Sequence, residues 1–177
     1  FDAITYTGNG TSQDIVTGID SVDFTVSGNG SGYWLDRTNN VVVDESTDLV
    51  TNGTFDVDTS GWTGNNATLS VSSNKMVVTN TAAYGDSYQV ITTEIGKDYV
   101  VAVDVSSIAQ TAFVLVGTTL DGYELSTSGA LSVDTSYVVK FTATTTSTYI
   151  QMQSGNAIGN TATFDNISVC EVSASGT

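Results

Sequence analysis

The side chains in this sequence that are best suited to binding chemistry are tyrosines that stand beside amides and carboxylates. Tyr84, Tyr88 and Tyr123 fall in loops or near the ends of expected strands, and Gln89 follows Tyr88 directly. A sugar ring binds on the flat face of an aromatic side chain while neighbouring polar groups hydrogen-bond its hydroxyls. These four residues predict a glycan-binding surface, against the general tendency of aromatic residues in a small sandwich to belong to its core.

The residue types that most enzymes use are scarce. The 177-residue chain contains no His and a single Cys, Cys170. The commonest general base and the multi-Cys metal sites are therefore missing. The four glutamates are scattered along the chain and show no pattern of the paired carboxylates that hydrolyse glycosides. We therefore expect a protein that is not an enzyme.

The charge of the chain limits its partners. Four Lys and Arg residues stand against 19 Asp and Glu residues, which gives a net charge of −15. Contacts with phosphate groups need a basic surface. The charge therefore argues against nucleic acid and against anionic membranes, and it is typical of a highly soluble surface.

The scaffold that positions the tyrosines is predicted to be all-β. Abundant Val and Thr favour strands, and Gly and Asn favour tight turns. Alternating or short apolar runs, separated by turn signals at intervals of roughly 8–12 residues, are typical of a sandwich or barrel. The expected strands are residues 3–6, 14–16, 21–26, 33–36, 41–43, 49–56, 67–72, 75–80, 87–92, 98–106, 112–120, 122–126, 136–144, 149–154 and 163–172.

The character of the sequence changes near residues 44–48. Residues 1–45 contain short runs and two Gly-Asn-Gly turns, which is too little to bury a core independently. We interpret them as an N-terminal β arm or small β subdomain, followed by one sandwich domain over residues 46–177. A single continuous sandwich, with the first strands at its edge, is an equal alternative.

Three segments in the second part resemble a known family. They are residues 49–56 (LVTNGTFD) with 60–62 (SGW), residues 88–91 (YQVI) with 96–99 (GKDY), and residues 162–169 (ATFDNISV). In this order they resemble the jelly-roll carbohydrate-binding modules of families 4 and 9, which belong to the galactose-binding-like sandwiches. The resemblance covers residues 49–172 and implies a jelly-roll β-sandwich in which the first and last strands pair, as do the two strands around the middle motif.

The same resemblance implies a structural calcium ion near the two strand ends. Asp56 and Asp165 occupy the positions of acidic residues that lie near calcium in the family, and Asp58 is a further candidate ligand. The commoner family residue at the position of Asp56 is Glu, which is longer. Calcium takes six to eight oxygen ligands.

The expected core contains Phe55, Trp62, Tyr99, Val101, Val103, Phe141, Phe164 and Ile167.

The first part resembles openings found in structural proteins of marine tailed phages. Residues 1–13 (FDAITYTGNGTSQ) carry this resemblance, with residues 22–24 and 33–37 loosely consistent with it. The resemblance covers about 40 residues and implies a virion setting, without fixing which part of the virion. An arm of short strands also needs a partner for its unpaired edges.

The leading functional hypothesis is a non-enzymatic virion surface protein of a tailed phage, either a capsid decoration or part of a tail or fibre. It would act by adhesion, with weak glycan binding as an added activity, and would bind other virion proteins or copies of itself in a symmetric assembly. The first alternative is a carbohydrate-binding module of a secreted polysaccharide-degrading enzyme or adhesin. The second is a surface-layer or extracellular filament subunit.

Overall fold

The computed structural model describes residues 4–8, 11–15, 35–36, 41–43, 47–106 and 108–174, with side chains for 47–106 and 108–172. All regular elements in these ranges are strands. The described residues therefore contain no helix that is long and apolar enough to cross a membrane. The strands are β1 Ile4–Gly8, β2 Thr11–Ile15, β3 Leu35–Asp36, β4 Val41–Val43, β5 Thr63–Asn65, β6 Ala67–Ser72, β7 Lys75–Asn80, β8 Asp86–Thr92, β9 Asp98–Ser106, β10 Ala112–Gly117, β11 Ser126–Thr127, β12 Thr135–Thr142, β13 Ser147–Ser154 and β14 Thr161–Ala174.

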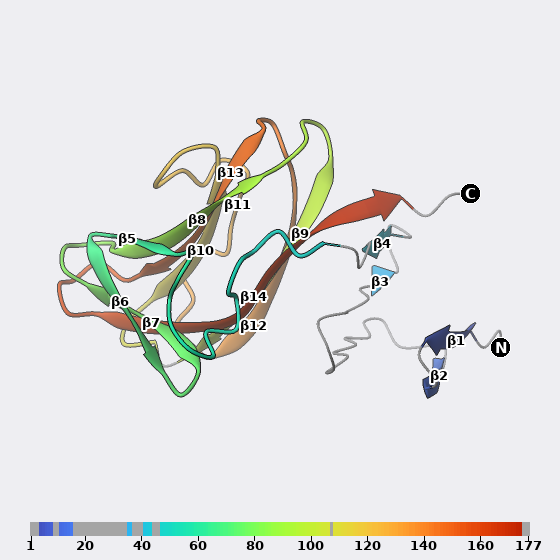
Figure 1. The fold of residues 1–177 in the computed structure, drawn as a ribbon. Helices are drawn as coiled ribbons and strands as arrows, with labels where there is room; N and C mark the ends of the chain where they lie inside the picture. Colours follow the sequence, from blue (N-terminus) through green and yellow to red (C-terminus); the bar gives the residue numbers. More distant parts are fainter. Residues whose placement is uncertain are drawn as a thin grey trace.

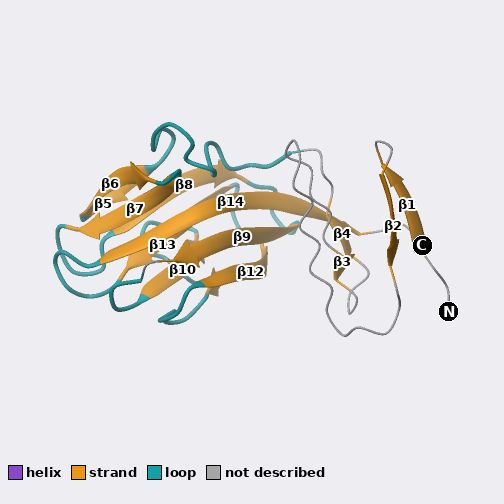
Figure 2. Cartoon of the chain, turned by 90° about the horizontal axis from the view of Figure 1, so that it is seen from below, coloured by secondary structure: helices purple, strands orange, loops and turns teal. Residues whose placement is uncertain are grey.

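Two antiparallel sheets form the body of the molecule (Figure 1). One has the strand order β11-β10-β13-β8-β5. In the other sheet, β9 lies between β12 and β14. The opposite edge of β14 pairs with β7 near the start of β14 and with β4 near its end. Figure 2 shows β14 running through the body and on toward β4. The fold is the expected all-β jelly-roll sandwich.

The core lies between the sheets because apolar residues alternate along the strands. Every second residue of β9 is buried, from Tyr99 to Val105, and the same alternation buries Met76 and Val78 of β7. Removing such side chains from water is the main favourable term in folding. The prediction of the core is confirmed, since all eight expected residues are at most 7% exposed.

The prediction of a strand over residues 49–56 is wrong, although this segment does lie beside β14. The amide of Leu49 donates to the carbonyl of Val169 (2.8 Å), and the amide of Ile167 donates to the carbonyl of Gly53 (3.0 Å). Asn52 and Phe55 have φ angles of 55° and 50°. Residues in the left-handed backbone conformation turn the chain out of an extended path. The segment therefore pairs with β14 at separate points and forms no continuous ladder.

Other boundaries also differ from expectation. The strands β8 and β9 are consecutive but lie in opposite sheets, so the middle motif does not form a strand pair. Residues 118–125 form a loop that ends at the two-residue strand β11, where a strand over 122–126 was expected. The expected strands do not include β5, which contains Gly64 and Asn65, yet β5 pairs with β8.

Part of the N-terminal region can be placed by strand pairing. The strands β1 and β2 pair with each other, β3 pairs with β4, and β4 continues the sheet by pairing with the end of β14, where Val43 lies opposite Val172. The expected strand over residues 21–26 lies outside the described residues. The boundary near residue 45 stays a prediction.

Candidate functional site

The outer face of the five-stranded sheet carries the aromatic and amide side chains. Opposite residues of antiparallel strands lie on the same face. Tyr88 of β8 lies opposite Gln151 of β13, and Val90 lies opposite Tyr149. Ile91 is buried and points into the core, so its neighbours Val90 and Thr92 face outward. We call this surface the tyrosine face.

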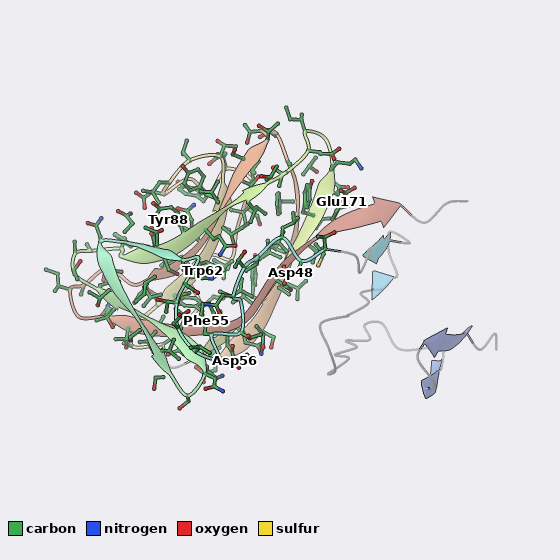
Figure 3. All side chains as sticks on the ribbon, viewed as in Figure 1. Asp48, Phe55, Asp56, Trp62, Tyr88 and Glu171 are labelled. Atoms are coloured by element: carbon green, nitrogen blue, oxygen red, sulfur yellow. The ribbon has the colours of Figure 1, made fainter. Side chains whose placement is uncertain are left out.

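Two tyrosines occupy its centre. The rings of Tyr88 and Tyr149 are half-buried, with centroids 5.8 Å apart and planes inclined by 37°. Val90, beside them, is 46% exposed. Figure 3 shows Tyr88 well away from Asp56, one of the expected calcium ligands. Two adjacent, partly exposed aromatic rings form an apolar platform to which a sugar ring can bind.

A loop of residues 118–125 crosses part of this face. The side-chain amide of Gln151 donates to the carbonyl of Gly122 (2.8 Å), and its oxygen accepts from the amide of Asp121 (2.6 Å). The sheet and loop backbones touch so closely that a Cβ at Gly117 would lie 2.4 Å from Gly122. Gln151 is therefore fully buried despite facing outward. We call residues 118–125 the crossing loop.

The crossing loop is stabilised internally as well. Glu124 accepts hydrogen bonds from the amide of Thr118 (2.5 Å) and from its hydroxyl. These donors hold the pKa of Glu124 below its ordinary value. Leu125 then donates to the carbonyl of Val116 (3.1 Å), which returns the chain to the sheet.

The structure places the four predicted ligand-binding residues differently. Tyr88 lies on the tyrosine face, Tyr123 is 63% exposed on the crossing loop, and Tyr84 is 49% exposed in the loop before β8. Gln89 points to the other side of β8 and is 8% exposed. Its amide donates to the carbonyls of Thr51 (3.0 Å) and Gly61 (3.1 Å), and its oxygen accepts from the amide of Thr51 (2.7 Å). Gln89 therefore connects β8 to the segment before β5.

An open groove of about 530 Å³ lies beside this connection. The strand β5 pairs with residues 86–88 of β8 only, so the edge of β8 beyond residue 88 has no partner in that sheet among the described residues. The groove is lined by Asp48, Leu49, Thr51, Gly61, Gln89, Val90, Ile91 and Thr92. The groove adjoins the tyrosine face at Val90.

The acids considered for calcium lie on the other sheet and the segment beside it. Asp56 is exposed and accepts from the hydroxyl of Thr54 (2.9 Å), whereas Asp58 accepts from the amide of Ser60 (2.9 Å). Hydrogen bonds from Ser60 lower the pKa of Asp58. Burial raises the pKa of Asp165, and the charges of Asp104 and Asp56 add to that increase. Asp56 therefore acts on Asp165 through its charge.

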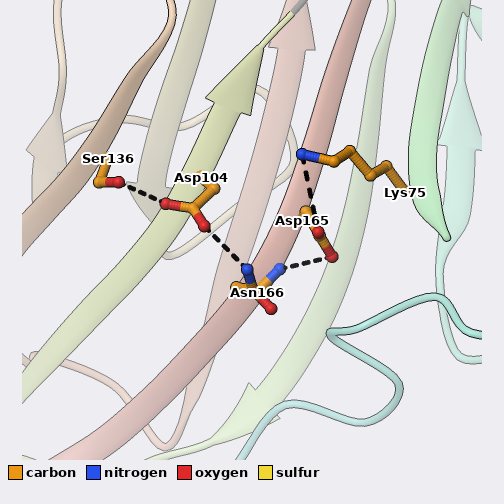
Figure 4. A network of polar contacts seen from close by, with 5 residues as sticks. All are labelled: Lys75, Asp104, Ser136, Asp165 and Asn166. Carbon is orange, nitrogen blue, oxygen red and sulfur yellow. Dashed lines mark hydrogen bonds and ion pairs between the residues drawn. The ribbon is translucent and has the colours of Figure 1, made fainter. Parts of the chain in front are cut away.

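Asp104 is the acid that sequence reasoning missed in this region. It lies directly opposite Asp165 on β9, a pairing of like charges that costs stability unless donors compensate it. Figure 4 shows the donors: Lys75 lies 3.9 Å from Asp165, while the side-chain amide of Asn166 donates to Asp104 (2.8 Å). The backbone amide of Asn166 donates to Asp165 (2.9 Å), and Ser136 donates to Asp104 (2.5 Å).

These donors restrict what the acids can offer a metal ion. The described residues contain no group of three or more His, Cys, Asp or Glu side chains arranged to hold a metal ion. Asp56 and Asp165 supply two carboxylates, and Lys75 already contacts one of them. A calcium ion would need further oxygens from carbonyls or water, and it would replace Lys75 as the positive charge beside Asp165.

Comparison with known proteins relates this geometry to a class of fold. No family model and no curated protein matches the chain. A solved structure described as "CBM4 structure and function" aligns with a TM-score of 0.53 and 17% identity, covering 68% of this chain and 98% of that one. The CBM22-1 xylan-binding domain from Paenibacillus barcinonensis Xyn10C aligns with a TM-score of 0.55 and 14% identity, covering 73% and 97%.

A phage protein is among the structural neighbours too. The enzymatically active domain of bacteriophage CBA120 tailspike protein 4 aligns with a TM-score of 0.51 and 14% identity. The match covers 70% of this chain but 21% of the tailspike chain. At these identities the matches show the fold, and the neighbours that the chain covers almost completely are carbohydrate-binding modules.

Proposed function

We propose that this chain is a glycan-binding module that uses the tyrosine face. The observation that carries the proposal is the Tyr88–Tyr149 pair, whose half-buried rings lie 5.8 Å apart beside an exposed valine. The neighbouring carbohydrate-binding modules support it, since they share the sandwich that presents this face.

The surroundings of the tyrosine pair suit a sugar. The apolar rings would stack on the C–H face of a pyranose, while Tyr hydroxyls and the exposed Thr92 of β8 would hydrogen-bond its hydroxyl groups. Tyr123, on the crossing loop, provides a further exposed ring. Neutral glycans suit the acidic chain, because an anionic polysaccharide would be repelled by a net charge of −15.

Affinity measurements with soluble polysaccharides, including xylan, test the proposal. Calorimetry with Tyr88→Ala and Tyr149→Ala should show at least about a tenfold loss of affinity, equivalent to about 1.4 kcal/mol. Val138→Ala is the matched control, because Val138 is 45% exposed on β12 of the opposite sheet. Equal affinities for the three variants and the unchanged protein would refute the tyrosine face as the binding surface.

A virion or appendage setting is a second proposal, supported by the tailspike neighbour and by the resemblance of residues 1–13. In it, residues 1–45 would join the sandwich to other virion proteins or to copies of itself. Native mass spectrometry of the full chain, and of a variant without residues 1–45, tests this role. A symmetric oligomer that is lost on deletion supports it, and a monomer in both cases supports the secreted, extracellular module instead.

The structural calcium ion is a third proposal, and it concerns stability rather than ligand recognition. Asp56 and Asp165 would hold the ion, and Asp58 would contribute from the neighbouring turn.

A further inference from the structure

A carboxyl group without a donor is buried where the crossing loop meets the sheet. Asp86, the first residue of β8, has an exposed fraction of 0%. Neither of its carboxylate oxygens has a hydrogen-bond partner. A buried ionised carboxylate that lacks donors is strongly unfavourable, so this side chain needs a positive charge or a proton.

The groups that face Asp86 supply no positive charge. Asn65 of β5 and Gln153 of β13 lie directly opposite it on either side, and both are neutral amides. The loop before β8 contributes Tyr84, which is uncharged and 49% exposed. The crossing loop contributes Asp121, whose carboxyl accepts a hydrogen bond (3.4 Å) from Asn65, the residue directly opposite Asp86.

The second carboxyl makes the first one harder to ionise. Burial, followed by the contact with Asp121, raises the pKa of Asp86 to about 7. Two neighbouring carboxyl groups cannot both ionise without strong repulsion, and they commonly retain one proton between them. Asn65 donates to Asp121 at 3.4 Å, and its hydrogen bond also lowers the pKa of Asp86, although by less than burial and Asp121 raise it.

The contact is placed where it can control the crossing loop. The loop is held to β13 through Gln151, which bonds the backbone of Asp121 and Gly122. The next point of attachment lies on β5 and β8, where Asn65 donates to Asp121 and Asp86 lies opposite Asn65. If both acids ionise, their repulsion acts at the tip of the loop, directly beside the tyrosine face.

We propose that Asp86 and Asp121 share one proton and that this acid pair fastens the crossing loop across the five-stranded sheet, so that the loop opens when the pair loses its proton. The consequence for the ligand rests on the proposed function: opening would move Tyr123 away from the border of the tyrosine face. The attachment of the loop itself does not depend on any ligand.

The sign of the pH dependence follows from the raised pKa. The closed loop binds the proton more tightly than the open loop, in which Asp86 returns toward its ordinary pKa near 4. The opening equilibrium should therefore increase about tenfold per pH unit between pH 5 and pH 7, and level off above pH 7.

Nuclear magnetic resonance of the full chain with chelator present tests the proposal. The carboxyl carbon of Asp86 should titrate near pH 7, and the crossing-loop amides should lose exchange protection over the same range, after correction for the intrinsic pH dependence of exchange. Asp86→Asn and Asp121→Asn each provide an amide donor that needs no proton, so their loops should stay protected through pH 8. Asp134→Asn, an exposed acid in the loop before β12, is the charge-matched control and should behave like the unchanged protein.

Four results would overturn the proposal. Three of them are titration of Asp86 near pH 4, loop protection that is independent of pH, and loss of protection in the two Asn variants that matches the unchanged protein. A fourth is a shift of the pair's resonances on adding calcium at pH 8, which would mean that a cation bridges the acids. Because none of these measurements uses a glycan, failure of the acid pair and failure of the proposed binding function are separate outcomes.

Discussion

Replacing Gly53 by alanine should lower the free energy of unfolding by more than the change in backbone conformational freedom explains. A Cβ at Gly53 would lie 1.9 Å from the carbonyl oxygen of Ile167, more than 1 Å inside the closest ordinary contact. The segment must therefore move away from β14. The hydrogen bond from Ile167 to Gly53 would be lost at a residue that is 2% exposed.

The size of the effect can be worked out from these contacts. An unpaired buried amide costs about 1–3 kcal/mol. Displacement of the neighbouring Phe55, which is fully buried, adds a similar amount as its contacts loosen. We expect Gly53→Ala to lower the free energy of unfolding by about 3 kcal/mol.

Gly96→Ala is the matched control for this experiment. Gly96 has a φ of 82° and nothing within 4 Å of an added Cβ, so its replacement should cost about 1 kcal/mol, from backbone strain alone. Urea unfolding followed by tryptophan fluorescence measures both variants, since Trp62 packs on Phe55 with ring centroids 5.8 Å apart. If Gly53→Ala costs no more than Gly96→Ala, the close approach to β14 does not carry the stability assigned to it.

Three further predictions concern stability, metal and reactivity. Phe164→Ala should lower the free energy of unfolding by about 3–5 kcal/mol, because Phe164 is fully buried; a loss below 1 kcal/mol in urea unfolding would contradict its place in the core. If Asp56 and Asp165 hold calcium, chelator should lower the melting temperature and added calcium should restore it, whereas the Asp165→Ala variant should not respond; an unchanged melting temperature in chelator argues against the ion. Cys170 should react slowly with iodoacetamide at pH 8, because burial raises its pKa to about 11 and leaves about one thiolate in a thousand; mass spectrometry should show a rate far below that of a free thiol, and equal rates would refute the burial of its sulfur.

The strands that a sequence pattern predicts well are those with long alternation. Residues 67–72, 75–80 and 98–106 were predicted with the observed bounds, because their apolar residues repeat every second position and face one core. The short strand β5 has no such repeat. It forms because β8 offers it a partner, and pairing between distant segments leaves no local signal.

The candidate site shows the same limit. Gln89 stands two residues before the buried Ile91 on one strand, so alternation already indicated that it faces inward. Tyr149 was not singled out, because its importance depends on the register that places it opposite Val90, beside Tyr88. The contact between Asp86 and Asp121 depends on where the crossing loop folds, which no local pattern in the sequence specifies.

The position of β14 has a consequence for how the chain is made. This strand follows every other described strand in the sequence, yet it lies inside its sheet and pairs with β9, β7 and β4. Asp48 accepts from the amide of Val169, across 121 residues of sequence. Until residues 161–174 have been synthesised, the edge of β9 that β14 covers and the segment before β5 lack their partner. We expect these long-range pairings to make folding slow, with a period in which incomplete chains depend on the high negative charge of the sequence to stay apart.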